Sequence, residues 1–186
     1  GVVEYKIRRM RGIMKKKSVI IALMVMTMAV SACGNRSENG TINGEITETK
    51  ENQLEGSCED ILQEIYANAK TEDDFFSYTD DYENMEISAD DAEYILGTTD
   101  ISYTDSVYSA PMMSSIAYEC VVLRVSEDQD VEEAKKLLLE NADPAKWICV
   151  EAESVIAENV GDVILFMMAD QDITDAAKEA FFALAK

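Results

Sequence analysis

The stretch VILFMMA at residues 163–169 is apolar at every position and is the clearest indication of the fold class. Successive side chains of a β-strand point to opposite faces of its sheet, so a strand with two apolar faces is typical of a sheet interior. Residues 163–169 are therefore expected to form a central strand.

A second strand is predicted from the stretch AYECVVLRV at residues 117–125. Its alternation places Ala117, Val121, Leu123 and Val125 with Glu119 on one face, and Tyr118, Cys120, Val122 and Arg124 on the other. Neither face is wholly polar. The pattern therefore predicts a strand but leaves open which of its faces meets the core.

Periodicity in the remaining sequence completes an α+β pattern. Helices are expected at residues 58–69, 89–96, 131–142 and 173–184, and strands at residues 101–110, 117–125, 147–156 and 163–169. The order α-α-β-β-α-β-β-α puts helices between pairs of adjacent strands, which favours a mostly antiparallel sheet. The sequence predicts a single α+β domain with helices packed on a sheet of about four strands.

Polar residues indicate where several of these elements begin. Ser88, Asp130 and Asp172 are each expected to cap a helix, because their short side chains can accept hydrogen bonds from free backbone N–H groups. Residues 71–86 are acidic and aromatic and are expected to form a loop. Residues 147–156 alternate in a way that suits a strand with one side on the core and one toward solvent.

The stretch MKKKSVIIALMVMTMAVSAC at residues 14–33 has a basic start, an apolar run and an end of small residues. A membrane-spanning helix takes about 20 apolar residues. This run is shorter, and no basic flank follows it, which favours a secretory signal peptide. Its end, Val30-Ser31-Ala32-Cys33, resembles the lipobox of bacterial lipoproteins.

That resemblance implies diacylation of the Cys33 thiol and cleavage of the chain before Cys33. A secreted protein with a chance cysteine at the cleavage point and an uncleaved membrane anchor are the alternatives. Either a lipid on Cys33 or an uncleaved anchor would hold the rest of the chain on the extracellular side of the cell membrane.

Three parts are expected along the chain. Residues 1–32 are interpreted as the signal peptide, in which residues 1–13 are a mis-set start or an extended basic region. Residues 33–56 begin with the lipidated cysteine and continue with Gly, Asn, Ser, Thr and Glu, a composition that predicts a flexible acidic tether. The about 130 residues of 57–186 are enough for one globular core.

Charge excludes one class of partner. Residues 33–186 hold 9 of the 16 basic and 36 of the 37 acidic side chains, a net charge of −27. Such a surface is repelled by the phosphates of nucleic acids and by anionic lipid headgroups. Nucleic acid is therefore not expected as a partner, and contact with the membrane is expected only through the N-terminal lipid.

Histidine is absent from the chain. Its absence removes the usual general base, the usual zinc ligand and every Ser/His or Cys/His dyad. The chain is therefore not expected to be an enzyme, and no cofactor is expected.

Three further cysteines, Cys58, Cys120 and Cys149, follow Cys33 without forming a CxxC pair. A disulfide between Cys120 and Cys149 is conceivable, because both residues lie in predicted strands. Three small buried thiols are the alternative. The sequence leaves the pairing open.

Two groups of residues between positions 71 and 86 are candidates for binding. The first could gather oxygen ligands for calcium and consists of Asp73, Asp74, Asp80, Asp81 and Glu83. The spacing of an EF-hand is missing, so a solvated acidic loop is the alternative. The second could line a groove for a peptide or a sugar, or pack on the core, and consists of Phe75, Phe76, Tyr78 and Tyr82.

The carboxylate pair Glu151 and Glu153 is the one candidate for catalysis, since glycosidases use two carboxylates. As residues i and i+2 of a predicted strand, the two side chains would share one face. Keeping an exposed sheet face hydrated is the alternative role.

The whole pattern resembles a family of short clostridial lipoproteins that is classed only as a domain of unknown function. The resemblance covers residues 58–186 and rests on four stretches: Ser109-Ala110-Pro111, Glu119-Cys120-Val121-Val122, the Glu-rich helix at 131–139 and VILFMMAD at 163–170. It implies a surface-exposed lipoprotein of a Gram-positive anaerobe. It implies no catalytic or binding residues.

These observations predict a non-enzymatic, membrane-anchored module of the cell envelope that binds a protein or a small ligand. A calcium-dependent envelope module using residues 73–83 is the alternative. A hydrolase working through carboxylates alone is a remote third.

Overall fold

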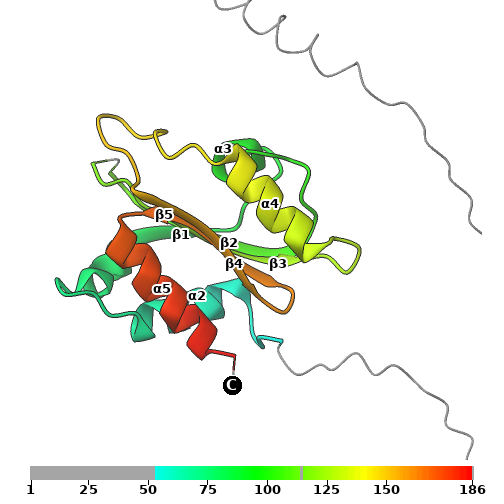
Figure 1. Ribbon diagram of the computed structural model, residues 1–186, viewed down its shortest axis with the longest axis horizontal. Coiled ribbons are helices and arrows are strands. Elements are labelled where there is room, and N and C mark those ends of the chain that lie inside the picture. The colour runs from blue at the N-terminus through cyan, green and yellow to red at the C-terminus, as the bar shows by residue number, and fades with distance from the viewer. Residues whose placement is uncertain (1–52, 114, 186) are drawn as a thin grey trace, which may run out of the picture. The chain divides into compact units, whose positions relative to one another are not determined.

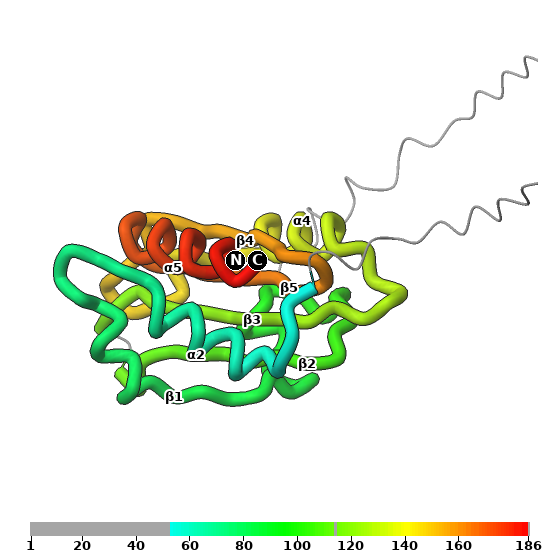
Figure 2. Tube along the Cα trace, turned by 90° about the horizontal axis from the view of Figure 1, so that it is seen from below, coloured from blue at the N-terminus to red at the C-terminus, as the bar shows by residue number. Residues whose placement is uncertain are grey.

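The computed structural model describes residues 53–113 and 115–185. Its centre is a sheet in the order β1-β2-β3-β5-β4, which Figure 2 shows. Every pairing of neighbouring strands is antiparallel. The strands are β1 (Tyr82–Met85), β2 (Tyr103–Pro111), β3 (Glu119–Val125), β4 (Ser154–Val160) and β5 (Val163–Ala169). The apolar stretch at 163–169 is thus an interior strand, as expected.

Helices cover both faces of this sheet. Figure 1 shows α3 and α4 on one face, and α2 and α5 on the other. The helical segments are α2 (Cys58–Asn68), the 3₁₀ helix η1 (Phe75–Asp81), α3 (Ala92–Leu96), α4 (Val131–Asn141) and α5 (Gln171–Ala183). The predicted α+β class is confirmed.

The sheet separates two hydrophobic cores, and β3 contributes to both. Tyr118, just before the strand, and Val122 pack with α2 and α5. Val121 and Leu123 pack with α3 and α4. The two faces predicted for residues 117–125 are therefore correct, and both are apolar because each is covered by helices.

The prediction of about four strands missed β1. Residues 71–86 were expected to form a loop, but they contain η1 and then β1, which pairs with β2 from Tyr82 opposite Pro111 to Met85 opposite Tyr108. β1 is a four-residue edge strand with exposed side chains at Glu83 and Met85. An edge strand this short gives no apolar run that a sequence pattern can detect.

The strand expected at residues 147–156 lies further along the chain, as β4 at Ser154–Val160. Its extent could not be predicted from the sequence because it contains polar side chains. Glu158 pairs with Lys178 of α5 at 2.8 Å, and the Asn159 side-chain oxygen accepts a hydrogen bond from Lys135 of α4 at 2.9 Å. Since helices on both faces bind these polar groups, β4 tolerates residues that resemble a turn.

Of the three predicted caps, only Asp130 is confirmed, since its Oδ1 accepts a hydrogen bond from the Glu133 N–H at 2.8 Å. The cap predicted at Asp172 is wrong, because α5 begins at Gln171 and Asp172 lies in its first turn. The predicted Ser88 cap is also wrong: α3 begins at Ala92 after a turn, and Ser88 contributes its carbonyl oxygen instead.

The signal peptide, Cys33 and nearly all of the tether fall outside the described residues. Within 53–113 and 115–185, no helix is both long and apolar enough to cross a membrane.

Candidate binding site

Polar clusters lie at both ends of β3, the middle strand of the sheet. Arg124 lies near the carboxyl end of the strand, and Glu119 begins it. Five strand steps separate them, a distance of roughly 17 Å at the usual rise per residue. The two clusters therefore belong to opposite ends of the domain.

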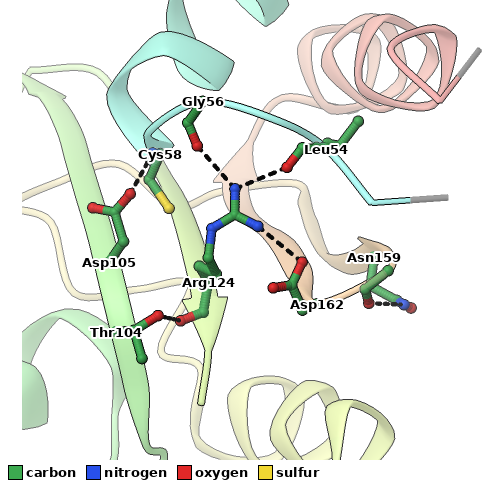
Figure 3. Close-up of polar contacts among 9 residues, drawn as sticks. Leu54, Gly56, Cys58, Thr104, Asp105, Arg124, Asn159 and Asp162 are labelled. Atoms are coloured by element: carbon green, nitrogen blue, oxygen red, sulfur yellow. Dashed lines mark hydrogen bonds and ion pairs between the residues drawn. The ribbon is translucent and has the colours of Figure 1, made fainter. Parts of the chain in front are cut away.

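The Arg124 cluster fixes the segment by which the chain enters the domain, as Figure 3 shows. Arg124 Nη2 donates to the carbonyl oxygens of Leu54 at 3.0 Å and Gly56 at 2.9 Å, and Nη1 pairs with Asp162 at 2.9 Å. The Cys58 N–H donates to Asp105 Oδ2 at 2.7 Å. Residues 54–58 are thus tied to β2, β3 and the β4–β5 turn.

Replacing Arg124 with methionine is expected to lower the free energy of unfolding by about 2 kcal/mol, because carbonyl groups of the entry segment lose a charged donor. Urea unfolding measures this loss. Lys178→Met is the matched control, since Lys178 forms a partly exposed ion pair with Glu158 at 2.8 Å, and its loss should cost about 0.5 kcal/mol or less. Equal losses in the two variants would contradict a clamp at Arg124.

At the other end of β3, Glu119 is completely buried on the face covered by α3 and α4. Lys146, from the segment between α4 and β4, reaches this carboxylate and forms an ion pair with Oε2. Only 9% of the Lys146 side chain is exposed. Among the described residues, the second carboxylate oxygen, Oε1, has no hydrogen-bond partner.

Two aromatic rings enclose the ammonium group of Lys146. Nζ lies 4.8 Å from the centre of the Tyr94 ring and 5.7 Å from that of Trp147, within the range of cation–π attraction. Nζ also donates to the carbonyl oxygen of Tyr94 at 3.3 Å. We call Glu119, Tyr94 and Trp147 the cation cage, and Lys146 is its occupant.

Burial governs the protonation of this site. It raises the pKa of Glu119 from 4.5 to about 7, although the charge and hydrogen bond of Lys146 act in the opposite direction. Burial also raises the pKa of Tyr108 on the neighbouring strand, and the Glu119 charge adds to that rise. A carboxyl group that titrates near neutral pH is typical of functional sites.

The raised pKa makes stability depend on pH in a definite direction. The stability gained by protonating Glu119 is fully present below about pH 4.5 and lost as the pH rises through about 7. From pH 4 to pH 8 the free energy of unfolding should therefore fall by about 3 kcal/mol more than in Glu119→Gln/Lys146→Met. Urea unfolding of both proteins at several pH values measures this difference, and the same pH dependence in the two proteins would contradict the prediction.

The charged or titratable groups around Glu119 are Lys146, Tyr108 and Cys120.

A pocket of about 290 Å³ adjoins the cage, between α3 and the end of α4. Lys146 and Tyr94 line it, together with Met168, the residue opposite Glu119 in the β3–β5 pairing. Its volume is near the lower end of the range for small-ligand sites.

Gly97 allows the end of α3 to come close to the end of α4, and this contact forms one wall of the pocket. It ends α3 with a φ of 73°, a left-handed conformation that favours glycine. A Cβ at this position would overlap the carbonyl group of Asn141 at the end of α4. The backbones of the two helix ends can thus meet only because residue 97 lacks a side chain.

The acidic residues proposed as calcium ligands are distributed over three elements. Asp73 and Asp74 precede η1, Asp80 and Asp81 end it, and Glu83 lies on β1. In the part of the chain that the structure describes, no three His, Cys, Asp or Glu side chains are grouped so that they could hold a metal ion. The five candidates are therefore not brought together as one site.

The aromatic residues of the same region mainly pack on the core. Phe75 lies 5.4 Å from Phe76 and 5.3 Å from Tyr118 between ring centres, and Tyr82 lies 5.1 Å from Tyr118. Tyr78 is the exception, since 67% of it is exposed. For the other three residues the packing interpretation is confirmed.

Glu151 and Glu153 lie in the segment before β4 and are exposed. The argument that they share one strand face is therefore wrong, because neither residue is in a strand. Their side chains are exposed to solvent, in contrast to the completely buried Glu119.

Cys58, Cys120 and Cys149 are all free thiols. The conceivable Cys120–Cys149 disulfide is not formed, and the alternative of three buried thiols holds for Cys58 and Cys120 only, because Cys149 is exposed. Burial raises the pKa of both buried thiols to about 12.

Thiol reactivity should follow this division. In a Cys33→Ser chain at pH 8, one thiol, that of Cys149, is expected to react with an aromatic disulfide reagent while the protein is folded, because the other two are buried and protonated. All three should react in urea. A Cys149→Ser variant that still reacts quickly when folded would contradict the assignment.

Sequence reasoning missed the cage, although it placed Glu119 in an apolar stretch. A charged side chain in such a strand indicates a buried partner. The partner could not be identified, because Lys146 comes from a segment that was expected to enter a strand, and Tyr94 comes from a separate helix.

No protein-family model, curated protein or solved structure was found to match this chain. The resemblance to the clostridial lipoprotein family therefore stays a prediction.

Proposed function

We propose that this chain is a lipid-anchored, surface-exposed lipoprotein of a Gram-positive bacterium, and that its domain is a non-enzymatic binding module of the cell envelope. Its ligand site is the cation cage with the adjoining pocket. The observation that carries the proposal is the buried Glu119–Lys146 ion pair beneath two aromatic rings, beside an open pocket.

Stability alone gives little reason for such a pair. Removing two charges from water costs several kcal/mol per ion, and replacing a buried ion pair with apolar residues is often neutral or stabilising. In a binding site, a buried ion pair has a role, because buried charge and aromatic faces select ligands by charge and shape.

The position of the cage also suits a tethered module. The chain enters the domain at the Arg124 cluster, and the cage lies at the opposite end of β3. The end of the domain that holds the cage is thus the end away from residue 54, where the chain enters the fold, which leaves the cage free to meet other molecules of the envelope.

Paired photo-crosslinking tests the binding role. A benzophenone amino acid replaces either Tyr94 at the cage or Tyr78 on η1, two tyrosines with the same exposed fraction of 67%. In cells that produce the protein, the probe at position 94 is expected to give a defined crosslinked product that the probe at position 78 does not give. Equal products from both positions, or none from position 94, would count against a site at the cage.

The proposed anchor has its own test. Cys33→Ser is expected to move the protein from the membrane fraction to the medium, since one cysteine carries the whole lipid attachment. Cys149→Ser, which removes the exposed thiol of the domain, is the control and should stay on the membrane. A Cys33→Ser protein that stays with the membrane would exclude lipid anchoring at this residue.

A further inference from the structure

The cation cage has the composition of a recognition site for an organic cation, yet a residue of the same chain occupies it. Its base is a buried carboxylate, its walls are two aromatic rings, and the Tyr94 carbonyl oxygen is a further acceptor. Carboxylates and aromatic faces both attract cations most strongly where water is excluded. Lys146 thus sits where the cationic group of a ligand would be bound.

Lys146 lies in an irregular segment outside every helix and strand, and its side chain can leave the cage while Trp147 stays packed against the core. The segment is closed at its neck by a hydrogen bond from the Ala152 N–H to the Pro144 oxygen at 2.9 Å. Between these residues it contains Ile148, which is 76% exposed, and Cys149, whose φ of 66° is unfavourable for a residue with a side chain. Because Lys146 also lines the open pocket, its side chain has space to turn outward.

Lys146 pairs with only one of the two carboxylate oxygens of Glu119. Lys146 contacts Oε2, whereas Oε1 is buried without a hydrogen-bond partner among the described residues. A buried acceptor without a donor has lost its hydrogen bonds to water and gained none in exchange. An ammonium group is compact, whereas a planar guanidinium can donate to both oxygens of a carboxylate at once and can stack on aromatic rings.

We infer that the cage binds a guanidinium group, and that Lys146 is an internal placeholder that this group displaces. The inference rests on the proposed function and names the ligand chemistry of the same site. The guanidinium would engage both Glu119 oxygens between Tyr94 and Trp147, and the remainder of the ligand would extend into the adjoining pocket. Its source is either a small arginine-like molecule or an arginine side chain of a protein.

Trp147 reports on this event without a label, because it is the only tryptophan of the chain. The purified full chain, kept in mild detergent, is titrated with N-acetyl-arginine amide while Trp147 emission is recorded. The neutral control is N-acetyl-citrulline amide, which has the same shape without the charge. A saturable change with the arginine compound and none with the citrulline compound is the expected result.

Lys146→Ala sharpens the test, because it removes the competitor. In the wild type, only the molecules in which Lys146 has left the cage can bind, so the apparent affinity is lowered in proportion to their fraction. Without Lys146 the cage is always open, and this variant should bind N-acetyl-arginine amide about tenfold more tightly or better. Glu119→Gln/Lys146→Ala lacks the carboxylate and should not bind. Its melting temperature, measured alongside, separates loss of binding from loss of folding.

Two outcomes would overturn the inference. One is the absence of binding in both the wild type and a folded Lys146→Ala variant. The other is tighter binding of N-acetyl-lysine amide than of N-acetyl-arginine amide, which would assign the cage to ammonium groups. The crosslinking at position 94 does not depend on ligand chemistry, so the proposed function can survive either result.

One further comparison distinguishes the two sources. A capped pentapeptide with arginine at its centre and alanine elsewhere is titrated beside N-acetyl-arginine amide. Tighter binding of the peptide indicates a protein partner whose backbone contributes contacts. Equal or weaker binding of the peptide indicates a small guanidinium compound.

Discussion

Replacing Lys146 with methionine is expected to lower the free energy of unfolding by about 3 kcal/mol at pH 8. The variant leaves the Glu119 carboxylate in the core with no opposite charge, and removing one partner of a buried ion pair is strongly destabilising. Below pH 5 the loss should be smaller, because Glu119 then becomes neutral by taking up a proton. Urea unfolding at both pH values measures the effect.

The double variant Glu119→Gln/Lys146→Met is the control for this experiment. It removes both charges and should regain most of the lost stability, since the cost comes from an isolated charge rather than from packing. If the double variant were as unstable as Lys146→Met, the ion pair would contribute stability of its own. The fold would then depend on this pair.

Gly97→Ala is expected to destabilise the domain by about 3 kcal/mol. The new Cβ would lie 2.8 Å from the carbonyl carbon of Asn141, so two backbone segments must separate. The left-handed φ of residue 97 adds about 1 kcal/mol of strain. Thermal unfolding measures the loss, and Trp147 emission should shift as α3 and α4 move apart beside the cage.

Gly56→Ala is the matched control, because Gly56 has a φ of 91° but more space. Its Cβ would lie 3.4 Å from the nearest atom, the Asp60 Cβ, which is ordinary contact. This variant should lose only the conformational part, about 1 kcal/mol. Equal losses at the two glycines would show that the contact between Gly97 and Asn141 is not what holds the helices in place.

Alternation and helical periodicity were sufficient to predict the elements that pack on the cores. The faces of residues 117–125 were assigned correctly because β3 obeys a strict two-residue period between two apolar layers. The interior place of residues 163–169 followed from the same rule. These elements can be predicted from the local sequence, because the pattern of apolar residues shows which side chains must be buried.

Elements at the edges of the sheet could not be predicted in this way. β1 is short and half exposed, and β4 includes Glu158 and Asn159, whose partners on α4 and α5 are distant in sequence. The cage could not be predicted for the same reason. Glu119, Tyr94 and Lys146 come from a strand, a helix and a connecting segment, and only the packed fold brings them together.

Acetylation of the Lys146 side chain shows whether Lys146 is a placeholder. Labelling by an acetyl ester is followed by mass spectrometry, without ligand and with saturating N-acetyl-arginine amide. Only 9% of the Lys146 side chain is exposed, so we expect slow labelling without ligand and faster labelling with it, because Lys146 is then expelled into solvent, while labelling of the 70% exposed Lys136 stays the same. Labelling of Lys146 that stays equally slow when the ligand is bound would mean that Lys146 remains in the cage and would contradict the proposal.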